Sequence, residues 1–293
     1  MQLDKANKSG GHMNKIEIIN MIPKFLSFYN EANKESAGPD RRWELWKERY
    51  RFAAVPPGDE GMKTARTLLD NAWNQYHEHI DWIKQWQPNS EKVHAILSDI
   101  QVKLGCQEDI DIDLIYFVGA FENNAFVAPY SQNRLALCLP VENGDSDILL
   151  AHELTHIVHA TTAQLSGAWE RTIATVIIQE GLAALMSKEI VPHQQDAAYI
   201  ECKAGWLQEC HAYRNQIIKG IIPYLQQSSS EVVTKFTVGK GTTNHEREAY
   251  YVGWVLVQYL LARGSTFKEI AHIQEQDLAQ LVKENLVELL QCQ

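Results

Sequence analysis

The stretch LLAHELTHIVHA, residues 149–160, decides how the chain is understood, because it contains two histidines four residues apart with a glutamate between them. His152 and His156 fall one helical turn apart on the same face, so their imidazoles can converge on a single ion. Zinc binds imidazole nitrogens at about 2.0–2.1 Å. Glu153 would lie beside that ion, where a carboxylate can accept a proton from metal-bound water.

A catalytic zinc ion needs a third protein ligand and one open position. His159 is nearby, but three histidines along one side of a helix approach an ion from nearly one line, so we interpret His159 as a flanking residue. A known alternative arrangement requires a histidine six residues after His156, and that position is Thr162. The third ligand must therefore come from elsewhere.

Glu180 is the better candidate, because the next predicted helix carries it on an otherwise apolar face. A buried carboxylate without a partner costs several kcal/mol, so a cation is expected to meet it. Gly181 and Ala184 keep the surrounding surface small and would let this helix approach the preceding one closely. Glu170 and Glu189 have more polar surroundings and are predicted to be solvated. We predict that Zn²⁺ is bound by His152, His156 and Glu180, with Glu153 as the general base of a hydrolytic site.

The secondary structure pattern predicts an α+β fold that is mostly α, since helices come first, then a small sheet, then helices again. Hydrophobic periodicity predicts helices over residues 16–33, 40–52, 61–87, 90–105, 147–161, 168–191, 194–219, 245–263 and 276–290. Runs of β-branched and aromatic residues predict strands over 112–119, 124–130 and 134–140. We expect three regions: a disordered tail or remnant of cloning (1–13), an N-terminal helical region (14–105) and a catalytic domain (106–293).

Composition narrows the possible partners. The formal net charge of −10 argues against nucleic acid, which requires a basic surface. The longest apolar run, residues 250–262, is too short to span a bilayer, so no stable membrane insertion is expected. The start of the sequence has no signal peptide pattern. Five cysteines without paired spacing favour free thiols and a cytoplasmic location.

The spacing of these residues resembles a known enzyme class. An HExxH motif followed by a glutamate on the next helix, 24 residues after the second histidine, resembles the gluzincin metallopeptidases. The segments QEGLAALM (179–186) and EAYYVGWVLVQYLL (248–261) are similar to the YjaZ-like family of predicted zinc-dependent proteases. The resemblance extends from about Ile112 to the C-terminus. It implies a zincin-like catalytic domain with a small mixed sheet, and a zinc metallopeptidase that acts on peptides or proteins.

The resemblance also implies further roles. Gluzincins use a downstream tyrosine or histidine to hydrogen-bond the developing oxyanion, and here Tyr250 is favoured, followed by Tyr251 and then His245. An edge strand before the zinc helix pairs with substrate in this class, and residues 133–141 stand in that place. The chain departs from the class at Ala184, where an acid often supports the zinc ligands.

Two other functions fit the same sequence. One is a zinc hydrolase that acts on a non-peptide amide or ester. The other is a non-catalytic helical binding protein in which the HExxH motif is coincidental. The oligomeric state and the cleavage specificity are not encoded in any pattern that we can identify.

Overall fold

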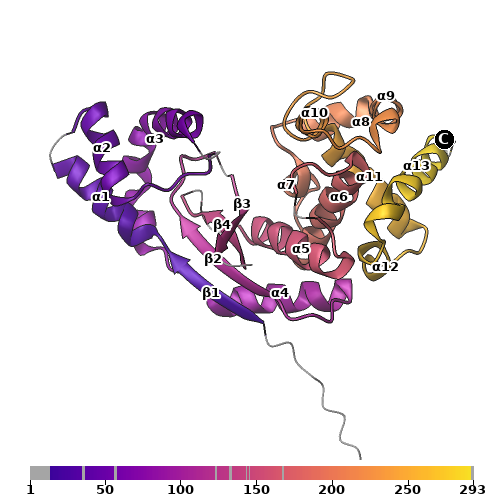
Figure 1. Ribbon diagram of the computed structural model, residues 1–293, viewed down its shortest axis with the longest axis horizontal. Coiled ribbons are helices and arrows are strands. Elements are labelled where there is room, and N and C mark those ends of the chain that lie inside the picture. Colours follow the sequence, from indigo (N-terminus) through magenta and orange to yellow (C-terminus); the bar gives the residue numbers. More distant parts are fainter. Residues whose placement is uncertain are drawn as a thin grey trace, which may run out of the picture.

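The structure is a computed structural model that describes residues 14–34, 37–55, 58–122, 124–131, 134–142, 144, 146–166 and 168–291. It is an α+β fold, mostly helical, with one small mixed sheet, as the sequence predicts (Figure 1). The tail expected at residues 1–13 lies outside the described residues. No helix in the described part of the chain is both long enough and apolar enough to cross a membrane.

The sheet has the strand order β1-β2-β4-β3. Strands β1 (Lys15–Asn20), β2 (Asp111–Phe117) and β4 (Arg134–Pro140) are parallel, and β3 (Phe126–Ser131) is antiparallel to β4. The expectation that residues 133–141 form an edge strand is wrong, because β4 is hydrogen-bonded on both sides. The edge strand next to β4 is β3. It comes before β4 in the chain and pairs with it in antiparallel orientation.

The prediction of one helix from Ile16 is also wrong. Residues 15–20 instead form β1, whose register with β2 pairs Ile16 with Ile112 and Ile18 with Leu114. Helix α1 (Ile22–Lys34) begins only after this strand, where the side chain of Asn20 accepts a hydrogen bond from the Ile22 amide. Long-range pairing in the sheet therefore overrides the local helical pattern.

Four helices come between β1 and β2 in the chain. The N-terminal helices α1, α2 (Pro39–Arg49) and α3 (Asp59–Gln85) lie to the left of the sheet in Figure 1. They are tied to the loop after β2 by two tyrosines: the hydroxyl of Tyr50 donates to the Val118 carbonyl at 2.8 Å, and that of Tyr76 donates to the Gly119 carbonyl at 2.6 Å. Helix α4 (Ser90–Leu104) ends at Gly105 in a left-handed conformation and precedes β2.

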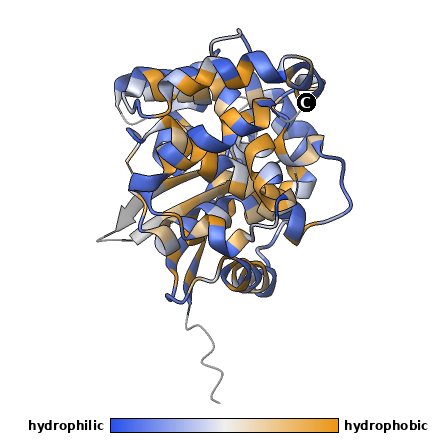
Figure 2. Cartoon of the chain, turned by 90° about the vertical axis from the view of Figure 1, so that its right-hand side faces the viewer, coloured by the Kyte–Doolittle hydropathy of each residue, from blue (hydrophilic) through white to orange (hydrophobic). Residues whose placement is uncertain are grey.

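The remaining helices form the right-hand part of Figure 1, with α6 (Ile173–Ile190) packed between α5 (Asp147–Ala163) and α11 (Glu248–Ala262). The helix predicted over 194–219 is broken by a turn at Gly205, whose φ is +81°. The segments around this core are α7 (Ala197–Ile200), α8 (Trp206–Ala212), α9 (Arg214–Ile221), the 3₁₀ turn Ile222–Tyr224, α10 (Ser230–Thr237), α12 (Phe267–Ala271) and α13 (Glu275–Gln291). Figure 2 shows hydrophobic stripes on these helices beside hydrophilic outer faces.

Candidate metal centre

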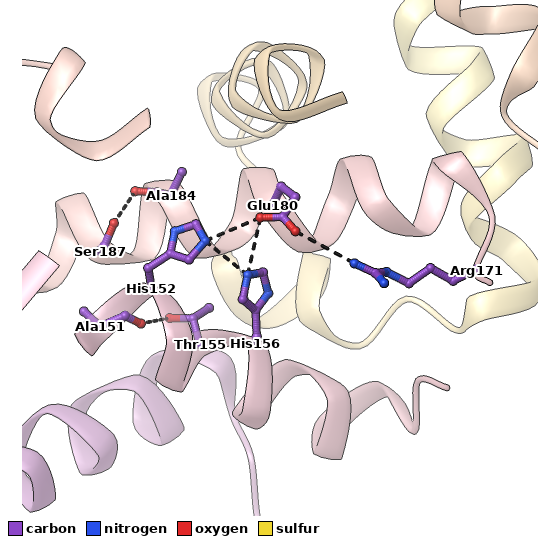
Figure 3. A network of polar contacts seen from close by, with 8 residues as sticks. All are labelled: Ala151, His152, Thr155, His156, Arg171, Glu180, Ala184 and Ser187. Carbon is purple, nitrogen blue, oxygen red and sulfur yellow. Dashed lines mark hydrogen bonds and ion pairs between the residues drawn. The ribbon is translucent and has the colours of Figure 1, made fainter. Parts of the chain in front are cut away.

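Helix α5 presents the two histidines. The Ser146 side chain caps its N-terminus by accepting a hydrogen bond from the Leu149 amide at 3.1 Å, and Asp147 in the first turn suits the positive end of the helix dipole. Most other residues of α5 are buried. The side chains of His152 and His156 point toward Glu180 of α6 (Figure 3). The side chains of His152 and His156 remain 16% and 21% exposed, so solvent can reach them.

Helix α6 supplies the carboxylate. The Thr172 side chain caps this helix by accepting from the Thr175 amide, and almost every residue from Ile173 to Ser187 is buried. Glu180 lies in the middle of this segment with only 4% of its surface exposed. Its Oε2 atom is buried and makes no hydrogen bond within the described residues. A carboxylate held in this way requires a cation to compensate for its desolvation.

The three side chains converge on one point (Figure 3). The Nε2 atoms of His152 and His156 lie 3.1 Å apart, and each lies 3.4 Å from Oε2 of Glu180. A tetrahedral zinc ion with bonds of about 2.0–2.1 Å has ligand atoms about 3.3 Å from one another. The donor set and its spacing therefore fit three corners of a zinc tetrahedron. Within the described residues, it is the one group of histidine, cysteine and acidic side chains close enough to hold a metal ion.

The electrostatics agree with a site built for a cation. Burial by itself would raise the pKa of Glu180, but the imidazoles of His156 and His152 outweigh it and hold that pKa well below its usual range. Burial by itself would lower the pKa of His156, but the effect of the Glu180 carboxylate is larger, so the pKa of His156 is raised. The carboxylate thus stays ionised, which is the form that binds a metal ion.

Glu153 and Tyr250 lie around this group. Glu153 is half-buried on α5, in the same turn as His152, and its charge acts on both His156 and Tyr250. Tyr250 is half-buried near the start of α11. Burial, with the charge of Glu180 as the next cause, raises the pKa of the Tyr250 hydroxyl, which therefore keeps its proton.

The other two predicted oxyanion donors have different surroundings. Tyr251 is fully buried, and its hydroxyl shares a hydrogen bond of 2.9 Å with Nδ1 of His211. His245 packs its ring at 4.9 Å from that of Tyr213, and its Nδ1 lies 2.8 Å from the Thr243 hydroxyl. Of the three, Tyr250 is the one whose pKa is affected by the charges of Glu180 and Glu153.

Arg171 is a neighbour of the group that the sequence pattern did not reveal. It lies in the loop before α6, and its guanidinium Nη2 is 4.0 Å from Oε1 of Glu180, the oxygen turned away from the histidines (Figure 3). Because a loop has no periodicity, no spacing in the sequence links this arginine to a glutamate nine residues later. His159, in contrast, is buried in the core and is not part of the group.

Comparison with known proteins agrees with this geometry. A family model described as "Predicted Zn-dependent protease (DUF2268)" matches residues 132–280. The match begins just before β4, includes α5, α6 and α11, and ends within α13, so it contains all three members of the metal-binding group. No curated protein matches the chain. Because the family match spans just over half of the 293 residues, the chain belongs to this family of predicted zinc-dependent proteases.

Proposed function

We propose that the protein is a zinc metallopeptidase that hydrolyses peptide bonds. The observation that carries the proposal is the triangle formed by the ligand atoms of His152, His156 and Glu180, whose edges of 3.1–3.4 Å match those of a zinc tetrahedron. Three protein ligands leave the fourth corner to water or substrate, which is the arrangement of catalytic rather than structural zinc sites.

Bound zinc would supply Lewis-acid polarisation of the peptide carbonyl and would acidify a water molecule. Glu153 then accepts the proton of the attacking water and returns it to the leaving amine. Tyr250 donates a hydrogen bond to the carbonyl oxygen as negative charge develops there, and its raised pKa keeps the required proton in place. His152, His156 and Glu180 would hold the ion.

The sheet supports a peptide as the substrate. Strand β3 lies at one end of the strand order and pairs with β4 on one side only. An edge strand offers unpaired backbone groups to which an extended peptide can add as another strand. Strand β4, which is paired with β3, leads directly into α5, so a peptide aligned on this edge would run beside the zinc helix.

Metal analysis and one substitution test the proposal. Purified protein is expected to contain about one zinc ion per chain. The Glu153→Gln variant should retain that zinc and lose the cleavage of a peptide library, because an amide cannot accept the proton. Glu170→Gln is the matched control, since Glu170 is exposed in the loop before α6 and should leave cleavage unchanged.

Three results would contradict the proposal. Absence of bound zinc would remove the metal centre. Full cleavage by Glu153→Gln would remove the assigned base. Zinc-dependent cleavage of esters or of non-peptide amides, with no peptide in the library cleaved, would assign the same site to a different hydrolase.

A further inference from the structure

Two arginines lie at the candidate site, one beside Glu180 and one beside Tyr250. Arg171 reaches from the loop before α6 toward Oε1 of Glu180 (Figure 3), and Arg247 precedes the first residue of α11. The rest of the chain is strongly acidic, with a net charge of −10. The two guanidinium groups therefore bring positive charge to a site that also contains the carboxylates of Glu153 and Glu180.

The hydrogen-bond donors of Arg171 are largely unused. Its distance of 4.0 Å to Glu180 is an ion pair but is too long for a hydrogen bond. The Nε atom is buried and has no hydrogen-bond partner among the described residues, while the side chain as a whole is 18% exposed. A guanidinium carries five N–H donors, and withdrawing them from water without acceptors is unfavourable. Arg171 is thus poised to receive an acceptor from outside the chain.

Arg247 lies beside Tyr250. Its guanidinium lies 5.0 Å from the centre of the Tyr250 ring, and no ion pair or hydrogen bond joins it to another described side chain. The backbone of Arg247 has φ of +55°, a left-handed conformation that residues other than glycine rarely adopt. This conformation determines the direction in which the Arg247 side chain leaves the start of α11. Tyr250 experiences the charges of both arginines, so the two belong to one neighbourhood.

A carboxylate is the acceptor that suits this arrangement. The planar fork of a guanidinium matches the two oxygens of a carboxylate, and charged hydrogen bonds of this kind are the strong ones. The Glu180 carboxylate does not fill this role, because its Oε1 atom lies 4.0 Å from the guanidinium, too far to accept a hydrogen bond. The half-exposed ring of Trp169, 5.9 Å from the Arg171 guanidinium, adds an apolar surface beside the same point.

We propose that Arg171, assisted by Arg247, binds a carboxylate of the substrate next to the scissile bond, so that the enzyme selects peptides with an acidic side chain or a free C-terminus there. This proposal rests on the zinc peptidase function proposed above and names its substrate class. Arg171 is the specificity-determining residue. Arg247 contributes a second positive charge beside Tyr250.

Binding of three matched hydroxamates to the zinc-loaded protein tests the proposal by calorimetry. Each probe has the same zinc-chelating hydroxamate on a succinyl group, followed by glutamic acid amide, by glutamine with a free carboxylate, or by glutamine amide. The first two carry one carboxylate, from a side chain or from a chain end, and the third carries none. At least one carboxylate probe should bind tenfold or more tightly than the neutral probe, and the tighter one identifies the source of the carboxylate.

Substitutions assign the preference to a residue. Arg171→Gln, compared as zinc-loaded protein, should bring the affinities for the carboxylate and neutral probes to within about twofold of each other. Arg171→Lys should restore part of the preference through charge alone. Arg247→Asn, which suits a left-handed backbone, should reduce the preference by a smaller factor.

Two outcomes would overturn the proposal. One is equal binding of all three probes by the unaltered protein. The other is a full preference for carboxylates that survives Arg171→Gln. Hydroxamate binding needs no peptide hydrolysis, so a protein that discriminates between the probes but cleaves no peptide would refute the peptidase function and leave the carboxylate site standing.

Discussion

Gly181 of α6 and Gly253 of α11 are in direct backbone contact: a methyl group added at Gly181 would lie 2.2 Å from the Gly253 carbonyl oxygen. A methyl group at Gly253 would lie 2.3 Å from the Ile177 carbonyl oxygen. The small side chains near Glu180 were expected from the sequence to bring α6 close to α5. At Gly181 the structure shows that they instead allow the close approach of α6 and α11. Glu180 precedes this contact directly and Tyr250 lies one turn before it, so the crossing sets the distance between them.

Alanine at either glycine is predicted to destabilise the protein. In an open helix this substitution would stabilise by about 1 kcal/mol, because glycine is the poorer helix former. Here the added methyl group meets backbone atoms that cannot rotate away, so we expect a loss of about 2–3 kcal/mol in the free energy of unfolding. Urea unfolding of Gly253→Ala measures it. Gly38→Ala is the control, since Gly38 has open space and φ of −68° and should change stability by less than about 0.5 kcal/mol. An unchanged midpoint for Gly253→Ala would contradict the close crossing.

The adjacent tyrosines of α11 are predicted to differ in their effect on catalysis. Tyr250→Phe removes the proposed donor to the carbonyl oxygen and should lower kcat by about 10²–10³-fold with zinc content unchanged. Tyr251→Phe removes the hydrogen bond to His211 and should cost about 1 kcal/mol of stability with little change in kcat. Steady-state kinetics and urea unfolding of both variants separate the two effects. A large loss of kcat in Tyr251→Phe, with Tyr250→Phe active, would reverse the assignment.

The protonation state of Tyr250 also predicts how kcat depends on pH. Since the pKa of Tyr250 is raised above its ordinary value of 10, the hydroxyl remains a donor throughout the neutral and mildly alkaline range. Deprotonation of this tyrosine therefore cannot cause a fall in kcat between pH 7 and 10. If an alkaline fall in that range is present in the unaltered enzyme and disappears in Tyr250→Phe, the proposed protonation state is wrong.

The metal-binding group was predictable because local rules position it. The i, i+4 spacing of His152 and His156 fixes their shared face on any helix, and the apolar stripe around Glu180 requires its burial. The strands β2, β3 and β4 were likewise visible as runs of β-branched and aromatic residues.

What the sequence hid depends on contacts between distant segments. Strand β1 exists because Ile16 and Ile18 pair with β2, while its own residues merge into the helical pattern that follows. The edge position of β3 is a matter of strand order, which no local pattern encodes. Arg171 meets Glu180 because its long side chain extends from the loop before α6 toward that carboxylate.

Removal of the Glu180 carboxylate is predicted to weaken zinc binding. Glu180→Ala takes away one of three ligands and the only one with a negative charge, so the affinity should fall by more than about 100-fold. Competition with a chromogenic chelator measures it. Glu170→Ala is the control, because Glu170 is an exposed glutamate in the loop before α6. Equal zinc affinity in Glu180→Ala and the unaltered protein would remove Glu180 from the site.

The buried imidazole of His159 is predicted to make the protein sensitive to acid. His159 is 1% exposed, and neither ring nitrogen has a hydrogen-bond partner among the described residues. Burial, and then the positive charges of His156 and His272, lower its pKa from 6.5 to about 3. Between those two pH values the unfolded chain binds a proton at this residue and the folded chain does not, so stability falls as the pH falls below 6.5. The loss is about 1.4 kcal/mol per pH unit for one such group, or roughly 3 kcal/mol at pH 4.5.

Unfolding of the zinc-free protein isolates this contribution. His159→Leu introduces an apolar side chain of similar size. The variant should therefore lose roughly 2 kcal/mol less than the unaltered protein between pH 6.5 and 4.5, since the unfolded histidine is already half protonated at pH 6.5. It should also be at least as stable at pH 7, because two unsatisfied ring nitrogens are removed from the core. His94→Leu, at an exposed position on α4, is the control and should retain the full acid sensitivity. Parallel pH profiles for His159→Leu and the unaltered protein would show that the imidazole is charged or solvated in the folded state, and would exclude a neutral His159 in the core.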